Sequence, residues 1–388
     1  MKVNRIIWVL VLIAIINSMG FGIIIPLLYP YGKKFGVNEH TIGLLTAAFS
    51  IAQFVATPIL GSLSDKWGRK PILVISLIGT AASFVLFGLA NSVFVLFAAR
   101  ILDGLTGGNI SVAQAMVSDI SSPKERAKNF GILSSAFGFG FVIGPAVGGL
   151  LSKFGMKVPF FFAAGIAVLG VILSMLFLKE TNKLKNATLK GGGFSVASLV
   201  TVLKKPVIGT AIATGFLLTM GQFAMIIGFQ TFSVDQLKLS TSQTGLFYAG
   251  FGITGIFMQL LVPVIKKIIP MQSVILLIST IFCLGMMIIT GFATGVILFA
   301  ISIAIYGLFN GLRNPMLNAI IADHNDEHHR GEVMGVNQAY ISIGQTLGPI
   351  TAGLVTVISV HSVFFLSAFY ILIALLFGIR LILKEKQS

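Results

Sequence analysis

Residues 131–149 read GILSSAFGFGFVIGPAVGG, and residues 335–353 read GVNQAYISIGQTLGPITAG. The two stretches share four glycines and a proline at one constant offset of 204 residues, and the match extends upstream without a gap. A further match at offset 202 relates residues 43–51 to residues 245–253. Such internal repetition predicts a chain of two related halves. The positions shared at offset 204 are Gly107, Asp119, Arg126, Gly131, Gly140, Gly144, Pro145 and Gly149, which recur as Gly311, Asp323, Arg330, Gly335, Gly344, Gly348, Pro349 and Gly353.

The composition is that of a membrane protein. Of 388 residues, 56% are hydrophobic and only 10% are charged, and the mean hydropathy is +0.97. Apolar runs of roughly 20 residues, each long enough to cross the bilayer, occur twelve times, and they lack the alternation of β-strands. We therefore predict an all-α membrane protein of twelve transmembrane helices in two pseudo-symmetric six-helix bundles. The predicted spans are 6–28, 39–60, 72–90, 94–118, 128–151, 158–178, 206–232, 240–264, 271–291, 294–322, 332–358 and 361–383.

The distribution of charge predicts the domains and the orientation. Residues 1–178 form the N-terminal six-helix bundle, residues 179–205 a lysine-rich cytoplasmic linker, and residues 206–388 the C-terminal bundle. Most of the 27 Lys and Arg fall in the termini and the even-numbered loops, which places both termini in the cytoplasm. A basic cytoplasmic surface also accounts for the net charge of +15, so we expect lipid and not nucleic acid as the partner.

Two related bundles in a membrane are typical of secondary transporters, which rock about a central site. The linker triplet Gly191–Gly193 lacks the Gly-Lys-Ser/Thr ending of a phosphate-binding loop, so we expect no nucleotide and no other cofactor. The histidines and acids of residues 323–329 lie in a predicted solvated loop, and we expect no metal there. No catalytic cluster is evident, so an enzyme is not expected. The energy source would be a proton gradient.

The turn between the second and third spans, GSLSDKWGRKP at residues 61–71, combines tight-turn glycines with basic residues. Its acid could cap a helix or pair with the arginine, as a latch between the halves that breaks when the cytoplasmic side opens. A solvated loop is the alternative. With two downstream residues, the predicted cytoplasmic gate comprises Gly61, Asp65, Gly68, Arg69, Lys70, Asp119 and Arg126.

This turn resembles the G-x-L-x-D-x-x-G-R-K signature of the major facilitator superfamily. Leu96, Arg100, Gly104 and Gly107 resemble the L-x-x-x-R-x-x-x-G-x-x-G pattern of its proton-coupled members. The run DISSPKERAKNFG at residues 119–131 is similar to the tetracycline-efflux branch of the twelve-span drug/proton antiporters. The fifth span matches G-x-x-x-G-P-x-x-G-G, which is associated with antiporters, at Gly140, Gly144, Pro145, Gly148 and Gly149.

The fifth-span motif also has a physical interpretation. Glycines four apart expose bare backbone on one helix face, and the proline removes a hydrogen bond, so this helix can pack closely and bend. Close packing against the other half could seal one state against ion leak. Ordinary tight helix packing is the alternative.

Asp103 is the only one of the twelve acidic residues that lies well inside a predicted span. Arg100 stands three residues earlier on the same face. Burial favours the protonated carboxyl and the arginine favours the ionised one, so the pair could respond to which side is open. We predict that Asp103 takes up the driving proton and that Arg100 modulates it. A permanently closed structural ion pair explains the same residues equally well.

Arg313 is the other buried charge, flanked by Asn310 and Asn314 on one helix. Interhelical hydrogen bonding is an alternative for each polar residue of the spans. Asn17 stands where the tetracycline branch has an aspartate, which leaves two arginines and one aspartate in the spans. This balance suits neutral or anionic substrates better than cations. The predicted substrate cavity is lined by Asn17, Gln53, Asn109, Gln222, Tyr248, Asn310, Arg313, Asn314, Asn337 and Gln338.

Together these features predict a monomeric, multi-pass transporter of a bacterial plasma membrane. The resemblance implies proton-coupled efflux of drugs or other small amphipathic molecules by alternating access. An importer, exporter or facilitator of a specific anionic or neutral metabolite on the same fold is the nearest alternative.

Overall fold

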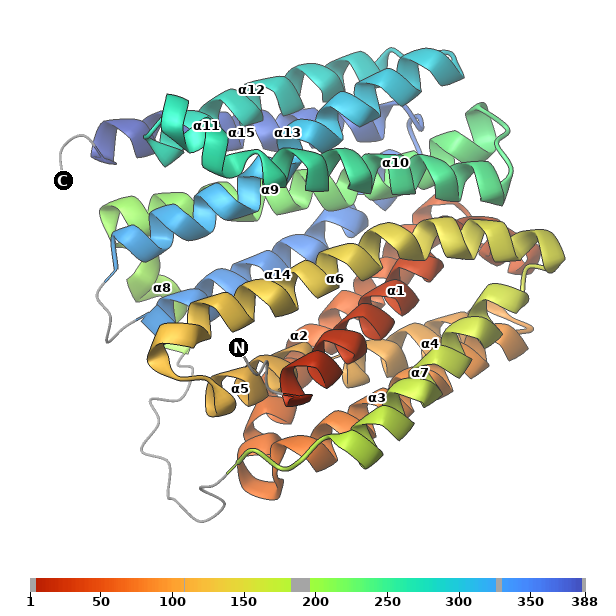
Figure 1. Ribbon diagram of the computed structural model, residues 1–388. Helices are drawn as coiled ribbons and strands as arrows, with labels where there is room; N and C mark the ends of the chain where they lie inside the picture. Colours follow the sequence, from red (N-terminus) through yellow and green to blue (C-terminus); the bar gives the residue numbers. More distant parts are fainter. Residues whose placement is uncertain (1–4, 108, 183–195, 326–329, 386–388) are drawn as a thin grey trace. The chain divides into compact units, whose positions relative to one another are not determined.

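The structure is a computed structural model that describes residues 5–107, 109–182, 196–325 and 330–385 (Figure 1). Helices are the only regular elements in these ranges, which confirms the all-α prediction. The helices of the first part of the chain are α1 (Arg5–Gly32), α2 (Glu39–Trp67), α3 (Arg69–Leu89), α4 (Val93–Thr106), α5 (Asn109–Ile120), α6 (Pro123–Leu151) and α7 (Val158–Phe177). Those of the second part are α8 (Val196–Leu203), α9 (Pro206–Thr231), α10 (Thr241–Leu260), α11 (Val262–Ile268), α12 (Gln272–Gly291), α13 (Val296–Asp323), α14 (Arg330–Val355) and α15 (Ser362–Glu385).

Every predicted span coincides with a helix or a pair of helices. In the described ranges, ten spans are long and apolar enough to cross a membrane, and the pair α10 and α11, bent by 50°, makes an eleventh. The predicted span 240–264 is present, but it is divided between α10, which ends at Leu260, and α11, which begins at Val262. The predicted span 332–358 corresponds to α14, which is long enough but too polar to be counted by composition. The twelve-helix prediction is thus roughly supported.

Two short features of the fold were not predicted. The span predicted at 94–118 corresponds to α4 and α5, and the described part of α4 ends at Thr106 with Gly107 as its C-cap. The linker contains α8, which packs against α9 and α14. The Tyr340 hydroxyl of α14 donates a hydrogen bond of 3.4 Å to the Leu199 carbonyl of α8.

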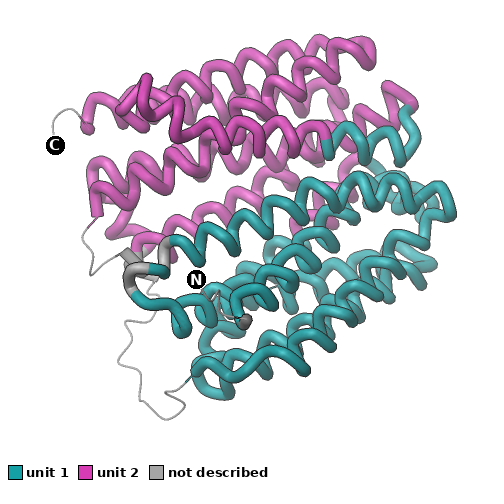
Figure 2. The backbone as a smooth tube through the Cα atoms, viewed as in Figure 1, with its two compact units in different colours: residues 1–38, 48–189, 239–249 teal, residues 39–47, 190–238, 250–388 magenta. Residues whose placement is uncertain are grey.

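The described helices belong to two compact units (Figure 2). Unit 1 consists of residues 1–38, 48–189 and 239–249, and unit 2 of residues 39–47, 190–238 and 250–388. The start of α2 therefore belongs to unit 2, and the start of α10 belongs to unit 1. The division predicted at residues 178 and 206 stays a prediction.

The same helix pairs are in contact inside each unit. In unit 1, α1 packs against α6 and α7, and α3 packs against α4 and α7. In unit 2, α9 packs against α14 and α15, and α12 packs against α13 and α15. These pairs correspond under the sequence repeat, so the duplication extends from the sequence to the packing within each unit.

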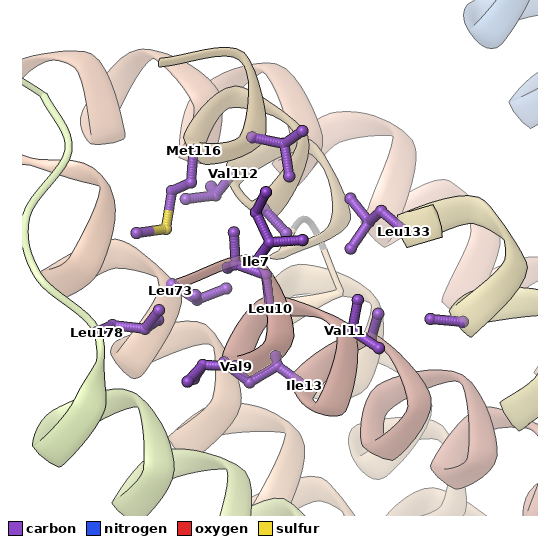
Figure 3. Packing of buried hydrophobic residues seen from close by; sticks show 14 of the residues in the cluster. Ile7, Val9, Leu10, Val11, Ile13, Leu73, Val112, Met116, Leu133 and Leu178 are labelled. Atoms are coloured by element: carbon purple, nitrogen blue, oxygen red, sulfur yellow. The ribbon is translucent and has the colours of Figure 1, made fainter. Parts of the chain in front are cut away.

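Buried aliphatic side chains hold one end of unit 1 together (Figure 3). Ile7 and Leu10 of α1 meet Leu73 of α3, Met116 of α5 and Leu133 of α6 in one cluster. Because lipid is as apolar as these side chains, close van der Waals packing is what favours helix contacts over lipid contacts. The cluster packs α3 and α5 together near the ends that carry Arg69 and Asp119.

Candidate functional site

The first candidate site is a buried charge pair on α4. Arg100 and Asp103 are only 2% and 5% exposed, and an Arg100 nitrogen lies 3.8 Å from an Asp103 carboxylate oxygen. This distance is too long for a hydrogen bond, so the pair is a loose one. The Arg100 guanidinium also lies 4.6 Å from the ring centre of Phe49 on α2. The Ser83 hydroxyl of α3 lies within hydrogen-bonding reach of Asp103.

Glycines of α4 bring this pair against α2. A side chain on Gly104 would meet the backbone of α2 at Phe49 and Gln53 and the side chain of Ala52. One turn later, the Gln53 side-chain amide donates a hydrogen bond of 3.2 Å to the Gly107 carbonyl. The spacing R-x-x-x-G-x-x-G thus has a packing cause, because the glycines let the two backbones approach and the arginine then faces α2. Arg100 and Asp103, the predicted proton-site residues, lie close together because residues three apart on a helix share one face.

The predicted cytoplasmic gate forms an ion-pair cluster in unit 1. The Arg69 side chain pairs with Asp65 at 2.6 Å and with Asp119 of α5 at 3.3 Å, and it donates a hydrogen bond of 2.7 Å to the Ser64 hydroxyl. Gly68 has φ +107°, a conformation that side chains rarely adopt, so glycine is needed to begin α3 directly after α2. The side chain of Arg126, also predicted here, lies outside the described residues.

Glu180, Thr181 and Asn182, which follow α7, complete this cluster. Sequence reasoning missed all three. One Glu180 carboxylate oxygen accepts hydrogen bonds from the Arg69, Thr181 and Asn182 N–H groups at 2.9, 3.0 and 2.9 Å. The other accepts one from the Lys70 N–H at 3.2 Å. Because no side chain near Gly68 caps α3, this distant carboxylate binds its free N–H groups.

Residues 180–182 also form hydrogen bonds with the end of α2 and the end of α5. The Asn182 side-chain amide donates a hydrogen bond of 2.7 Å to the Asp65 carbonyl, and the Thr181 hydroxyl donates one of 3.0 Å to Asp119. In return, the Lys70 ammonium donates one of 2.8 Å to the Met175 carbonyl at the end of α7. An acid between two predicted helices was the only signal in the sequence, and 111 residues separate it from the helix that it caps.

Opposing effects set the charge of Glu180. Partial burial raises the pKa of its carboxyl, but the N–H groups of Asn182, Arg69, Lys70 and Thr181 together lower it by more. The pKa therefore lies below the usual carboxyl value, and Glu180 is ionised near neutral pH. A carboxylate at a helix N-terminus also interacts favourably with the helix dipole.

The glycine motif of α6 makes two close contacts. Gly140 and Gly144 pack against the backbone of α1 near Ser18 and Gly22, so closely that a side chain on either would collide with it. Gly149 faces the start of α10, where an added Cβ would stand 3.1 Å from the Cα of Gly245. Gly148, one residue earlier, packs against α1 at Ile23. The motif thus packs α6 against two helices, and α6 runs through Pro145 without a break.

Unit 2 repeats this arrangement. Gly344 and Gly348 of α14 pack against α9, and Gly353 faces the start of α2, where an added Cβ would stand 3.4 Å from the Cα of Gly43. The offset of 204 relates Gly149 to Gly353, and the offset of 202 relates Gly43 to Gly245. The contact of Gly149 with Gly245 in unit 1 therefore corresponds to the contact of Gly353 with Gly43 in unit 2. The glycines shared by the two halves therefore make equivalent helix contacts.

The charge in unit 2 has a different environment from the pair in unit 1. Arg313 of α13 is 2% exposed, and its guanidinium donates a hydrogen bond to the Asn310 side-chain oxygen. Its Nε is buried without an acceptor. No carboxylate of the described residues forms an ion pair with it. The Arg313 charge is close enough to Tyr306 of α13 and Cys283 of α12 to interact electrostatically with both.

The other predicted cavity residues lie on several helices, and their shared cavity stays a prediction. Tyr248 and Asn337 are buried, Asn17 and Gln222 are half-buried, and Asn314 and Gln338 are exposed. The side chain of Asn109 lies outside the described residues. Of the predicted solvated loop, Asp323 accepts a 2.9 Å hydrogen bond from Gln272. The described residues include no group of three or more His, Cys, Asp or Glu side chains that could hold a metal.

Comparison with known proteins decides the family. A family model described as the Major Facilitator Superfamily matches residues 10–294 and 271–388. The chain belongs to the Major Facilitator Superfamily. As a member of that superfamily, it is a multi-pass membrane transporter of small molecules.

Several bacterial relatives of this superfamily member are named for drug resistance. Tetracycline resistance protein, class H, of Pasteurella multocida is 31% identical over 89% of this chain and 88% of its own length. Multidrug resistance protein 2 of Bacillus subtilis is 29% identical over 95% of this chain and 93% of its own length. Quinolone resistance protein NorA of Staphylococcus aureus is 28% identical over 99% and 97%.

Solved structures of the superfamily share the fold. A bacterial homologue of the human lysosomal transporter Spinster, in an inward-facing and unoccupied conformation, matches with a TM-score of 0.80 at 17% identity, over 97% of both chains. The nucleoside transporter NupG matches with a TM-score of 0.78 at 13% identity, over 98% of this chain and 99% of its own. At such identities, the likeness concerns the fold alone.

Proposed function

We propose that this transporter exports small amphipathic molecules from a bacterial cytoplasm in exchange for protons. The observation that carries the proposal is the loose pair of Arg100 and Asp103, since Asp103 is the only buried acidic side chain among the described residues. Relatives named for multidrug, tetracycline and quinolone resistance support the export of amphipathic compounds. We further propose that the protein acts as a monomer with both termini in the cytoplasm.

The pair suits proton coupling because its net charge changes with one proton. With Asp103 ionised, the two charges compensate each other inside the protein. With Asp103 protonated, Arg100 retains an uncompensated charge, which costs about 2.5 to 3.5 kcal/mol at mid-membrane by insertion scales. The two protonation states therefore favour different surroundings for the arginine, and a transporter with two conformations can use that difference.

The glycine contacts and the Arg69 cluster would lie near opposite ends of α2. With cytoplasmic termini, α2 begins at the outer surface, so the contacts of Gly43 with Gly353 and of Gly245 with Gly149 would close the outer side. The Arg69 cluster would lie at the inner side. Bare backbone makes the outer contacts, whereas ion pairs and caps make the inner one.

Transport by inverted membrane vesicles tests the proposal. Vesicles that contain the wild-type protein should accumulate tetracycline or a quinolone when an inward proton gradient is imposed, and a protonophore should stop this. Asp103→Asn should reduce gradient-driven accumulation at least about tenfold while ligand binding persists, and Asp103→Glu should retain part of it. Asp235→Asn, at an acid outside this pair, is the matched control. Full accumulation by the Asp103→Asn protein would contradict the proposal.

A facilitator or importer of an anionic or neutral metabolite is the second candidate. The buried, positively charged Arg313 favours it, because unit 2 presents a cation and no described carboxylate beside it. Such a protein would move its substrate inward or without a proton gradient. Uptake by right-side-out vesicles that the protonophore does not change would favour this second function over export.

A further inference from the structure

Arg313 lacks a counter-charge in the closed environment that the structure describes. Its guanidinium donates to the neutral amide oxygen of Asn310 and lies within hydrogen-bonding reach of the Tyr306 hydroxyl, and its Nε–H has no acceptor. A buried charge without an opposite charge is costly, and such charges in membrane proteins usually serve a ligand or an ion pathway. Arg100 at 3.8 Å from Asp103 shows that the same chain supplies a carboxylate elsewhere. An anion would supply the opposite charge that the described residues do not place beside Arg313.

A second unused donor lies on the same face of α13. Tyr306 precedes Arg313 by seven residues, two helical turns, and its side chain is completely buried. The Tyr306 hydroxyl hydrogen has no acceptor, and the hydroxyl oxygen lies within hydrogen-bonding reach of the Arg313 guanidinium. A phenol and a guanidinium both donate hydrogen bonds, so the pair presents donors and a positive charge. Oxygen atoms of a carboxylate would satisfy both and cancel the charge.

Apolar groups surround these donors. The Phe251 ring of α10 stacks on the Tyr306 ring, with centroids 6.0 Å apart and planes at 17°. The Cys283 thiol of α12 lies against the Tyr306 carbonyl, with the sulfur 3.9 Å from the oxygen. Aromatic and thiol walls favour a flat, apolar body, so the complementary ligand combines an aromatic ring with an anionic group.

Glycines let α10 approach α13 closely beside these donors. Gly307 and Gly311 of α13 meet α10 at Thr254 and Gly255, so backbone and short side chains make the contact. The same α10 ends at a 50° bend into α11. Phe251 is the large side chain in this contact, and the bend after Leu260 offers a place at which α10 could move.

We propose that Arg313 and Tyr306 form an anion-binding subsite for aromatic carboxylates, between α10, α12 and α13 of unit 2. The inference rests on the proposed transport of amphipathic molecules and names the chemical class that one end of the substrate would have. Arg313 binds the carboxylate, Tyr306 donates a second hydrogen bond, and Phe251 contacts the ring. In the absence of a ligand, Asn310 holds the guanidinium in place.

Binding by the purified full-length protein tests the subsite without any proton gradient. The probes are 1-naphthoate, its neutral amide and 1-naphthylmethylammonium, which share a ring system and differ in charge. Ligand-dependent thermal stabilisation and calorimetric titration measure their affinities. Wild type should bind naphthoate about tenfold or more tightly than the amide, as a charge-assisted hydrogen bond implies, and the ammonium compound most weakly.

Variants separate a binding role from a structural one. Arg313→Gln should lose about tenfold or more in naphthoate affinity and keep its affinity for the amide. Its melting temperature without ligand should be equal to or above that of wild type, because an uncompensated buried charge has been removed. Tyr306→Phe should lose naphthoate affinity severalfold. Ser302→Ala removes another buried hydroxyl of α13, one bonded to Thr290, and is the matched control.

Naphthoate that binds no better than the amide, including no binding of either, would overturn the subsite. So would an Arg313→Gln protein that melts earlier than wild type and binds naphthoate unchanged. These measurements involve no transport, so a failure of proton-driven export in vesicles would leave the subsite standing. Conversely, export can persist for neutral compounds even where the anion subsite is disproved.

Discussion

The buried charges of the two units contrast although the helices that carry them correspond. In unit 1, Arg100 of α4 has a carboxylate 3.8 Å away on its own helix. In unit 2, no carboxylate of the described residues forms an ion pair with Arg313 of α13, which donates to the amide oxygen of Asn310. The helix contacts repeat faithfully, whereas the charge chemistry does not. The duplication therefore preserved the packing and left the interior free to diverge, with a titratable pair in one unit and an uncompensated cation in the other.

The largest expected effect comes from breaking the unit 1 pair. Arg100→Gln leaves the Asp103 carboxylate buried without its partner, and removal of one member of a buried pair typically destabilises by about 3 to 5 kcal/mol. The double variant Arg100→Gln/Asp103→Asn should recover much of that loss, because no charge remains. Thermal unfolding in detergent measures both. Equal melting temperatures for the single and double variants would contradict a coupled pair.

The next effect sharpens the comparison at the ends of α3 and α12. Glu180→Ala frees the N–H groups of Arg69 and Lys70 and should cost about 1 to 2 kcal/mol, the usual value of a helix cap. Gln272→Ala removes one hydrogen bond from a side-chain amide to Asp323 in unit 2 and should cost less, because a single bond is lost. Thermal unfolding at neutral pH compares them, with the exposed neighbour variant Lys179→Gln as control. A larger loss for Gln272→Ala would reverse the assigned order.

The lowered pKa of Glu180 gives this prediction a pH dependence. A carboxylate whose folded pKa lies below its unfolded value, about 4.3 for Glu, stabilises the fold above that unfolded value. The contribution disappears as the pH falls through the folded pKa. The difference in melting temperature between wild type and Glu180→Gln should therefore be constant near neutral pH and shrink below about pH 4. A difference that grows on acidification would contradict it.

A smaller effect should follow from making unit 2 resemble unit 1. Asn310→Asp supplies Arg313 with an internal carboxylate, so the proposed anion subsite should lose about tenfold in naphthoate affinity, about 1.4 kcal/mol. Calorimetric titration measures the loss. Asn318→Asp adds an acid at an exposed position of the same helix, outside the predicted cavity, and serves as the control for net charge. Unchanged affinity in Asn310→Asp would show that Arg313 does not meet the ligand.

The smallest expected effects concern the symmetric glycine contacts. A methyl group at Gly149 would stand 3.1 Å from Gly245, so neighbouring backbone must shift, and we expect a loss of about 1 kcal/mol. Gly353→Ala should behave alike, as the repeat demands. Gly131→Ala, in open space on the same helix as Gly149, should instead stabilise by about 0.5 to 1 kcal/mol. Thermal unfolding of the three variants checks the pattern.

The sequence predicted the features that depend on periodicity and composition. Apolar runs located every long helix, and glycine spacing anticipated the faces that pack, since both act within one helix. The proximity of Arg100 and Asp103 was predictable for the same reason. The 50° bend between α10 and α11 was not, because the run stays apolar through Leu261 and composition alone does not show a change of direction.

Interactions between distant parts of the chain were beyond sequence reasoning. Glu180 caps a helix that begins 111 residues earlier, and only the folded unit shows that the end of α7 lies at that helix start. Arg313 was identified as a buried charge, but the lack of a described counter-charge and the unused hydrogen of the Tyr306 hydroxyl required coordinates. The assignment of polar residues to a cavity, transport direction and proton coupling stay predictions.

The exchange of helix starts between the units has a consequence for how this protein folds. Residues 39–47 leave the N-terminal half to complete unit 2, and residues 239–249 leave the C-terminal half to complete unit 1. The end of α6 at Gly149 can therefore make its contact with α10 only after residues 239–249 have been synthesised. We therefore expect each unit to be completed only after segments of both halves have been synthesised.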